Sequence, residues 1–175
     1  MIDDRTYLLE AFLEAEKAKE EGTYPIGAVI VDEEGRILSR GRNRVFSKGD
    51  TTAHAEVDAI RQCGTEMLDL TQKKFIKANY TLYTTCEPCP MCTCTILLCF
   101  SIKRVVWAAN DEDMGAMRKF KEGPHFLDRF DQISYVAAPF RDLEKKQRKM
   151  LAEWTLSRGY TDTYWRDDQE IGVDE

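Results

Sequence analysis

Four of the six cysteines lie within nine residues, and this clustering limits what the chain can form. They are Cys86, Cys89, Cys92 and Cys94. In a small secreted protein such a cluster favours disulfide bonds, whereas in a cytosolic chain it favours a metal site or catalysis. The first residues are acidic and lack the apolar run of a secretion signal, so we expect a cytoplasmic protein. A chain of 175 residues can also bury a core without covalent cross-links.

Helical and strand patterns alternate along the sequence. Leu8, Phe12 and Ala15 recur at helical spacing, and the apolar run from 25 to 31 predicts a buried strand. The predicted helices are 5–21, 53–63, 90–100, 111–122 and 143–157; the predicted strands are 25–31, 36–41, 79–85, 104–109 and 132–138; a loop is predicted at 42–52. This order predicts an α/β fold, namely a three-layer α/β/α sandwich with a mixed sheet.

Two short segments carry residue types suited to a catalytic metal site. His54 and Glu56 stand two residues apart in the first, and Cys89 and Cys92 stand three apart in the second, directly after Pro88. An H-x-E segment followed by P-C-x-x-C resembles the signature of zinc deaminases. The resemblance implies that His54, Cys89 and Cys92 bind Zn²⁺ and that Glu56 transfers protons.

The spacing is compatible with that chemistry. Catalytic zinc often takes three protein ligands, a Cys₂His set among them, and keeps a fourth position for water. Cysteines three residues apart at a helix start lie on one face, and the helix N-terminus favours their thiolates. Pro90 suits a first helical turn. Zinc lowers the pKa of bound water to about 7, and Glu56 would move a proton from that water to the ring nitrogen and then to the leaving ammonia.

Each half of the motif also has a simpler interpretation. A C-x-x-C pair alone is weak evidence for a metal, and a glutamate at a helix start can simply favour the helix dipole. A structural zinc site with Cys86 or Cys94 as fourth ligand would make the chain a non-catalytic, zinc-stabilised subunit, but it would leave Glu56 without a task. The remaining cysteines and histidine are expected outside the site: Cys63, Cys99 and His125.

Beyond the motifs, the sequence from about Leu8 to Ala109 resembles the cytidine deaminase superfamily, in the branch of free-base and tRNA deaminases. The segments that carry the resemblance are 24–28, Asn43, 52–56 and 82–92. The resemblance implies a central five-stranded sheet, one zinc ion per subunit and a homodimer. Members often have a small pair such as Gly-Ala after the second cysteine, whereas this chain has Thr93 and Cys94, so the packing of that helical turn is expected to differ.

Two further residues of the matched region are expected to contact the substrate. The resemblance implies that Asn43 hydrogen-bonds the base and that Ala55, between His54 and Glu56, also lies against it. The alternative for Asn43 is a turn residue, because asparagine tolerates left-handed backbone geometry.

The sequence divides into a deaminase-like domain at 1–158 and a C-terminal tail at 159–175. The tail places Trp165 and Asp168 in a pattern similar to the W-x-x-D tail of fungal cytosine deaminase, where it covers the site. Tyr160 and Tyr164 add aromatic surface that favours burial. We therefore predict an active-site lid in which Trp165 and Asp168 bind substrate; the alternative is docking on the domain surface or on a partner subunit.

The substrate is the least determined part of the sequence interpretation. The net charge is −6, and RNA binding relies on Lys and Arg at the phosphates. A closed lid would also suit a small molecule, so we rank a free base such as guanine or cytosine, or a nucleoside, above a tRNA adenosine. No apolar run is long enough to span a membrane, so no membrane partner is expected.

Overall fold

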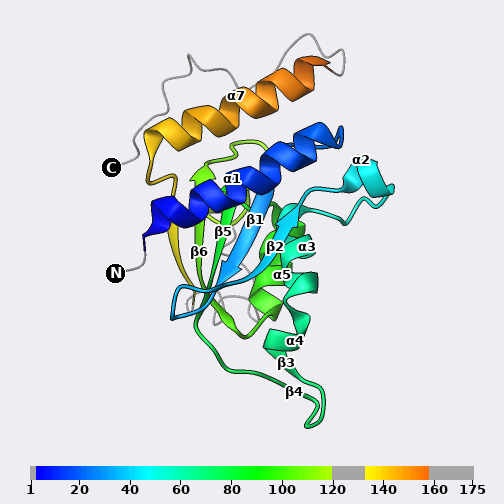
Figure 1. The fold of residues 1–175 in the computed structure, drawn as a ribbon. Coiled ribbons are helices and arrows are strands. Elements are labelled where there is room, and N and C mark those ends of the chain that lie inside the picture. Colours follow the sequence, from blue (N-terminus) through cyan, green and yellow to red (C-terminus); the bar gives the residue numbers. More distant parts are fainter. Residues whose placement is uncertain (1–2, 120–132, 158–175) are drawn as a thin grey trace.

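A five-stranded mixed sheet forms the centre of the fold (Figure 1). The computed structural model describes residues 3–119 and 133–157. The strands are β1 (Gly27–Val31), β2 (Ile37–Arg42), β5 (Tyr80–Cys86), β6 (Ile102–Ala109) and β7 (Ser134–Ala137), in the order β2-β1-β5-β6-β7. Strand β1 is antiparallel to β2 and β5, whereas β5, β6 and β7 are parallel.

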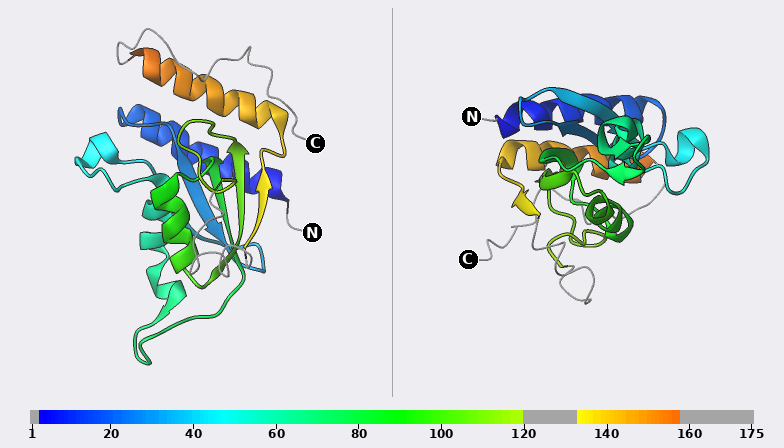
Figure 2. Two further views of the ribbon diagram at one scale, coloured as in Figure 1. Left: turned by 180° about the vertical axis from the view of Figure 1, so that it is seen from behind. Right: turned by 90° about the horizontal axis from the view of Figure 1, so that it is seen from below.

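Helices cover both faces of this sheet (Figures 1 and 2). The long helices α1 (Asp4–Glu20) and α7 (Arg141–Ser157) lie on one face, and α3 (Ala55–Gln62) and α5 (Pro90–Leu98) lie on the other. The predicted three-layer α/β/α sandwich with a mixed five-stranded sheet is therefore confirmed.

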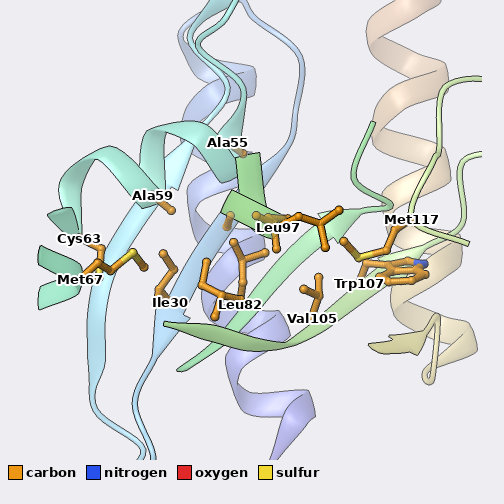
Figure 3. Packing of buried hydrophobic residues seen from close by; sticks show 13 residues of the cluster. Ile30, Ala55, Ala59, Cys63, Met67, Leu82, Leu97, Val105, Trp107 and Met117 are labelled. Atoms are coloured by element: carbon orange, nitrogen blue, oxygen red, sulfur yellow. The ribbon is translucent and has the colours of Figure 1, made fainter. Parts of the chain in front are cut away.

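The alternation of side chains along the strands explains the two-sided core. In β1, Ala28 and Ile30 pack with α3 and α5, whereas Val29 and Val31 pack with α1 and α7. Successive strand residues point to opposite faces, so a fully apolar strand needs a helical layer on each side. Figure 3 shows the α3 and α5 side of the core, where Ile30 lies next to the small residues of α3 and Trp107 lies beside Met117.

Gly41 allows helix α3 to lie directly against strand β2. A Cβ atom at Gly41 would collide with the backbone of Ala55 and Ala59, both in α3. The missing side chain therefore permits a backbone-to-backbone approach, which fixes the beginning of α3 relative to the sheet.

The structure differs from the predicted elements in three places. The predicted loop at 42–52 contains a one-turn helix, α2 (Val45–Lys48), which ends at Gly49 with a left-handed φ of 65°. A short helix α4 (Gly64–Met67) and a small hairpin of β3 (Leu68–Asp69) and β4 (Lys74–Phe75) follow α3, where no element was predicted.

The third difference is the predicted helix at 111–122, which is wrong over its described part, 111–119. These residues form turns. The Asp111 carboxylate accepts hydrogen bonds from the backbone N–H groups of Asp113 and Met114, at 3.0 and 2.9 Å, as a helix N-cap does. No helix continues from it, because Ala116 N donates to Pro88 O and Arg118 N donates to Glu87 Oε1, each at 3.0 Å, instead of to carbonyls four residues earlier. Residues 120–122 lie outside the described residues.

Among the helices of the described residues, none combines the length and the apolar character that crossing a membrane requires.

Candidate metal centre and active site

His54 stands at the start of helix α3. It is the N-cap residue, in an extended conformation, and its carbonyl accepts the first helical hydrogen bond from Asp58 N at 2.8 Å. The residue before it is also fixed, because Ala53 O accepts a hydrogen bond from Arg44 N at 2.8 Å. The backbone that carries His54 is therefore tied both to α3 and to the loop after β2.

Cys89 and Cys92 occupy the first turn of helix α5. Cys89 is the N-cap and Pro90 fills the first helical position, as expected from its fixed φ and missing N–H. Thr93 N donates to Cys89 O at 2.8 Å, so the turn that separates the two cysteines is regular. Both sulfur atoms thus lie at a helix N-terminus, where the dipole favours negative charge.

The side chains of His54, Cys89 and Cys92 converge although they come from two helices. One nitrogen of His54 and the two sulfur atoms all lie within 4.8 Å of one another. The His54 Nδ1 and Cys89 Sγ atoms are 3.6 Å apart. Within the described residues, this is the one group of three or more His, Cys, Asp or Glu side chains that could hold a metal ion.

Glu56 lies directly beside this group and is almost fully buried. Its Oε2 is 3.4 Å from Cys92 Sγ, and its Oε1 accepts a hydrogen bond from Thr84 Oγ1 at 3.4 Å. Burial raises the pKa of Glu56. A raised pKa makes a carboxyl group a stronger proton acceptor, which suits a general acid–base.

The two cysteines have opposite acidities. Hydrogen bonding with Cys92 and with His54 lowers the pKa of Cys89 to about 4. The contact with Cys89 and burial raise the pKa of Cys92. The contact with Cys89 raises the pKa of His54. Cys89 is therefore a thiolate at neutral pH, the form in which cysteine binds metals.

Cys86 lies away from this group of donors. Its sulfur donates a long hydrogen bond to Asp111 Oδ2, at 4.0 Å, and burial raises its pKa well above the ordinary value. Among the described residues, the donor atoms that lie within 4.8 Å of one another belong to His54, Cys89 and Cys92, so Cys86 stands outside the donor set. Cys94 is half-buried, and the two other cysteines pack in or against the core, as expected: Cys63 and Cys99.

Asn43 and Ala55 both have structural contacts. The Asn43 Oδ1 atom accepts hydrogen bonds from Thr23 Oγ1 at 2.7 Å and Val45 N at 3.1 Å, so the side chain shapes the turn before α2. Ala55 directly follows His54 in the chain, and its methyl group is buried in the core.

The other predicted site residues cannot be placed. Trp165 and Asp168, with the tail at 159–175 and the predicted lid, lie outside the described residues, as does His125.

Sequence reasoning missed a second set of buried polar residues beside the cysteine loop. Glu87 accepts hydrogen bonds from Asp111 N at 3.2 Å and from Arg118 Nε at 3.0 Å. Burial raises the pKa of Asp111. Thr84, behind Glu56, was also missed. For Glu87, the available signal was a charged residue inside the C-E-P-C segment. Its partner Arg118 stands 31 residues later in the sequence.

Comparison with known proteins agrees with this geometry. Residues 1–109 match the family model of the cytidine and deoxycytidylate deaminase zinc-binding region. The chain is 34 % identical over 172 residues to the tRNA-specific adenosine deaminase of Bacillus subtilis, a match that covers 87 % of this chain and 100 % of that protein. It is 35 % identical over 111 residues to the probable cytosine deaminase of Schizosaccharomyces pombe, with 63 % of each chain covered.

A further relative differs greatly in length. The chain is 41 % identical over 113 residues to the chloroplastic tRNA(adenine(34)) deaminase of Arabidopsis thaliana, but that match spans 65 % of this chain and 8 % of the plant protein. A structure solved in work on A-to-I editing by tRNA:A34 deaminases superposes with a TM-score of 0.66 at 29 % identity, covering 84 % of this chain and 99 % of the other. The chain thus belongs to the deaminase family defined by the cytidine and deoxycytidylate deaminase zinc-binding region.

Proposed function

We propose that the chain catalyses the hydrolytic deamination of an adenosine in tRNA, in which water replaces the amino group and ammonia leaves. The convergence of His54, Cys89 and Cys92 beside the buried Glu56 carries the chemical part of this proposal. The match to the whole length of the Bacillus subtilis tRNA-specific adenosine deaminase supports the choice of substrate.

A zinc ion fits the donor set. One imidazole nitrogen and two sulfur atoms within 4.8 Å of one another, one of them a thiolate at neutral pH, form a Cys₂His set that leaves a fourth position open. We assign His54, Cys89 and Cys92 as the residues that would hold it. Bound zinc supplies the Lewis acidity that makes water a nucleophile at neutral pH.

Glu56 is the proposed proton carrier. Its Oε1 is held by Thr84, which leaves Oε2 as the atom that exchanges protons. The Cys92 thiol donates a hydrogen bond to Oε2 at 3.4 Å. A Cys92 that binds metal as a thiolate no longer donates this hydrogen bond, so Oε2 can take a proton from water and deliver it to the ring nitrogen and to the leaving amine.

We assign Asn43 and Ala55 to contacts with the base, each through a specific group. The side-chain oxygen of Asn43 already accepts two hydrogen bonds. We therefore assign the side-chain NH₂ group of Asn43 as the donor to an acceptor atom of the substrate. For Ala55 the assigned group is its backbone N–H in the first turn of α3, where helical N–H groups lack intrahelical acceptors.

This proposal reverses the substrate order of the sequence analysis, which ranked a free base above tRNA. Net charge is a sum over the whole chain and does not report how cations are distributed around one site. A free base remains the second candidate because the probable cytosine deaminase of Schizosaccharomyces pombe matches at 35 % identity. The lid with Trp165 and Asp168, and a cytoplasmic location, remain predictions.

We also propose that the chain forms a homodimer. An apolar surface lies on the β3–β4 hairpin and the end of α5, where Phe75 and Phe100 pack with ring centroids 4.5 Å apart. Its exposed members are Leu68, Leu70, Phe75, Leu98 and Phe100. A contiguous apolar surface of this kind is typical of an interface, and a second copy is the proposed occupant. Light scattering of a Leu70→Glu, Phe75→Glu variant, which we expect to be monomeric, tests this assignment.

The substrate is tested by comparing the rates of deamination of separate candidates. Zinc-loaded protein is incubated with a tRNA anticodon stem-loop that has adenosine at the wobble position, and separately with adenosine, guanine and cytosine. Ammonia release and product mass are measured, with Glu56→Gln as the control for contaminating activity. We expect inosine in the stem-loop; faster conversion of cytosine or guanine would overturn the tRNA assignment in favour of the free-base candidate.

A further inference from the structure

The carboxylate of Glu87 is buried next to the cysteine loop and has no place in the proposed proton transfer. Its side chain is 0 % exposed, and it stands two residues before Cys89. Oε1 accepts a hydrogen bond from Arg118 N at 3.0 Å, and Oε2 accepts from Asp111 N at 3.2 Å and from Arg118 Nε at 3.0 Å. Both oxygens therefore bind the segment that follows strand β6.

This segment, residues 111–119, in turn holds the backbone beside Cys89. Ala116 N donates to Pro88 O at 3.0 Å, and Thr93 Oγ1 donates to the same carbonyl oxygen at 3.2 Å. The carbonyl that immediately precedes Cys89 is thus fixed from two directions. One of these two hydrogen bonds depends on the placement of segment 111–119.

Gly115 makes the close approach of the two segments possible. A Cβ atom at this position would collide with Glu87 Oε2 and with the carbonyl oxygen of Asp111. Glycine is therefore required here because the carboxylate lies against the backbone, and its φ needs no left-handed conformation. Glu87 therefore packs against Gly115 and at the same time forms an ion pair with Arg118.

We propose that Glu87 is a positioning residue for the metal ligand Cys89. This inference rests on the metal assignment of the proposed function. Residues that orient metal ligands from outside the coordination sphere typically change metal affinity or activity 10–100-fold when they are replaced. By holding segment 111–119 against Pro88, Glu87 keeps Cys89 in place before the metal arrives, so that binding does not have to order the loop.

Glutamine cannot replace this carboxylate, although it has the same shape. Both oxygens of Glu87 accept hydrogen bonds from N–H donors, and these donors cannot act as acceptors. An amide would place its NH₂ group against one of them, and the Arg118 guanidinium would lose its buried counter-charge. Glu87→Gln is therefore a small change that disrupts the whole contact.

Glu112 provides a matched control on the same arginine. Its Oε1 accepts a hydrogen bond from Arg118 NH2 at 2.8 Å, but its side chain is 57 % exposed. Glu112→Gln removes the same charge from Arg118 and leaves Pro88 and Cys89 untouched. The zinc affinity of wild-type, Glu87→Gln and Glu112→Gln proteins is measured by competition with a chromophoric chelator, and the melting temperature of each zinc-free protein is measured alongside.

We expect the zinc affinity of Glu87→Gln to fall about 10–100-fold and that of Glu112→Gln to match wild type. Wild-type affinity in Glu87→Gln, with only a lower melting temperature, would show a merely structural role and overturn the inference. An equal loss in both variants would overturn it as well. Because zinc binding is measured without substrate, a failure of the proposed deamination leaves this result unaffected.

A second variant serves if Glu87→Gln does not fold. Gly115→Ala keeps the carboxylate but pushes it out of its position, so the same fall in zinc affinity is expected. Its control is Gly64→Ala, because a Cβ atom at Gly64 meets nothing within 4 Å. Equal zinc affinities in these two alanine variants would contradict the positioning role.

Discussion

Oε2 of Glu56 lies 3.4 Å from the sulfur of Cys92, although 36 residues separate them in the sequence. One residue belongs to α3 and the other to α5, so the packing of these two helices determines the distance. The contact places the carboxylate that we propose for proton transfer beside a proposed metal ligand. The first prediction tests this carboxylate, and the second tests which cysteines bind the metal.

Glu56→Gln should bind zinc and fold like the wild type but lose most of its turnover. A positioned general acid–base is typically worth about 10²–10⁴ in rate, and an amide cannot carry the proton. Steady-state kinetics and zinc analysis of the same preparation provide the measurement, with the exposed Glu66→Gln as control. Near wild-type kcat in Glu56→Gln would refute the proton-transfer role.

Cys89→Ser should lose zinc, whereas Cys86→Ser should retain one ion per chain. The Cys89 sulfur lies with His54 and Cys92, whereas the Cys86 sulfur contacts Asp111. Metal analysis after dialysis distinguishes the two variants. Equal loss of zinc from both would mean that Cys86 is a ligand and that the site is structural, with four protein donors.

The ion pair between Asp4 and Arg104 should make stability depend on acid pH. Hydrogen bonds from Arg104 lower the pKa of Asp4 below its ordinary value of 3.8. The Asp4 carboxylate therefore binds a proton more tightly in the unfolded chain than in the folded protein. The stabilisation by the ion pair is present above pH 3.8 and is lost as the pH falls through the pKa of Asp4 in the folded protein. Asp4→Asn should cost about 1 kcal/mol at pH 7, since solvent screens part of the pair.

Urea unfolding at pH 7 and at pH 3 measures this effect. Asp142→Asn is the matched control, because Asp142 forms a similar two-point pair with Arg5 but is exposed. We expect the Asp4 variant to lose less stability on acidification than wild type. If its pH dependence equals that of wild type, other groups cause the acid sensitivity.

Ala138→Gly should stabilise the protein. Ala138 has a φ of +41°, which glycine adopts freely and alanine adopts at a cost of about 1–2 kcal/mol. Glycine also gives the unfolded chain about 0.5–1 kcal/mol of extra conformational freedom, so we expect a net gain of about 0.5–1 kcal/mol. Denaturant unfolding checks the sign, and Ala137→Gly, in strand β7, should be destabilising.

The elements with a regular apolar pattern could be predicted from the sequence to within a few residues. Helix α5, for example, begins at Pro90 as predicted. The helix predicted from 111 failed because the N–H groups of Ala116 and Arg118 donate to Pro88 and Glu87, in another segment, instead of to helical carbonyls. Such long-range contacts leave no periodic pattern in the sequence.

Some residues of the candidate site could likewise be predicted from the sequence, and others could not. The candidate ligands and Glu56 could be recognised because the H-x-E and P-C-x-x-C segments resemble the zinc deaminase signature, and the spacing of Cys89 and Cys92 fits one helical turn. Glu87 and Arg118 could not be paired, since only the packing of segment 111–119 brings them together. The contacts of Asn43 with Thr23 and Val45 were equally hidden, and they changed which atoms of Asn43 can contact a substrate.

The origin of the ligands from two helices has a thermodynamic consequence. An ion held by His54 and the two cysteines joins the start of α3 to the start of α5, and so cross-links positions 54 and 89 of the chain. Because the unfolded chain cannot present the same three donors together, the free energy of unfolding should rise with the logarithm of free zinc, by about 1.4 kcal/mol for each tenfold increase above the dissociation constant. Zinc depletion in a cell would thereby shorten the lifetime of this protein as well as abolish its proposed activity.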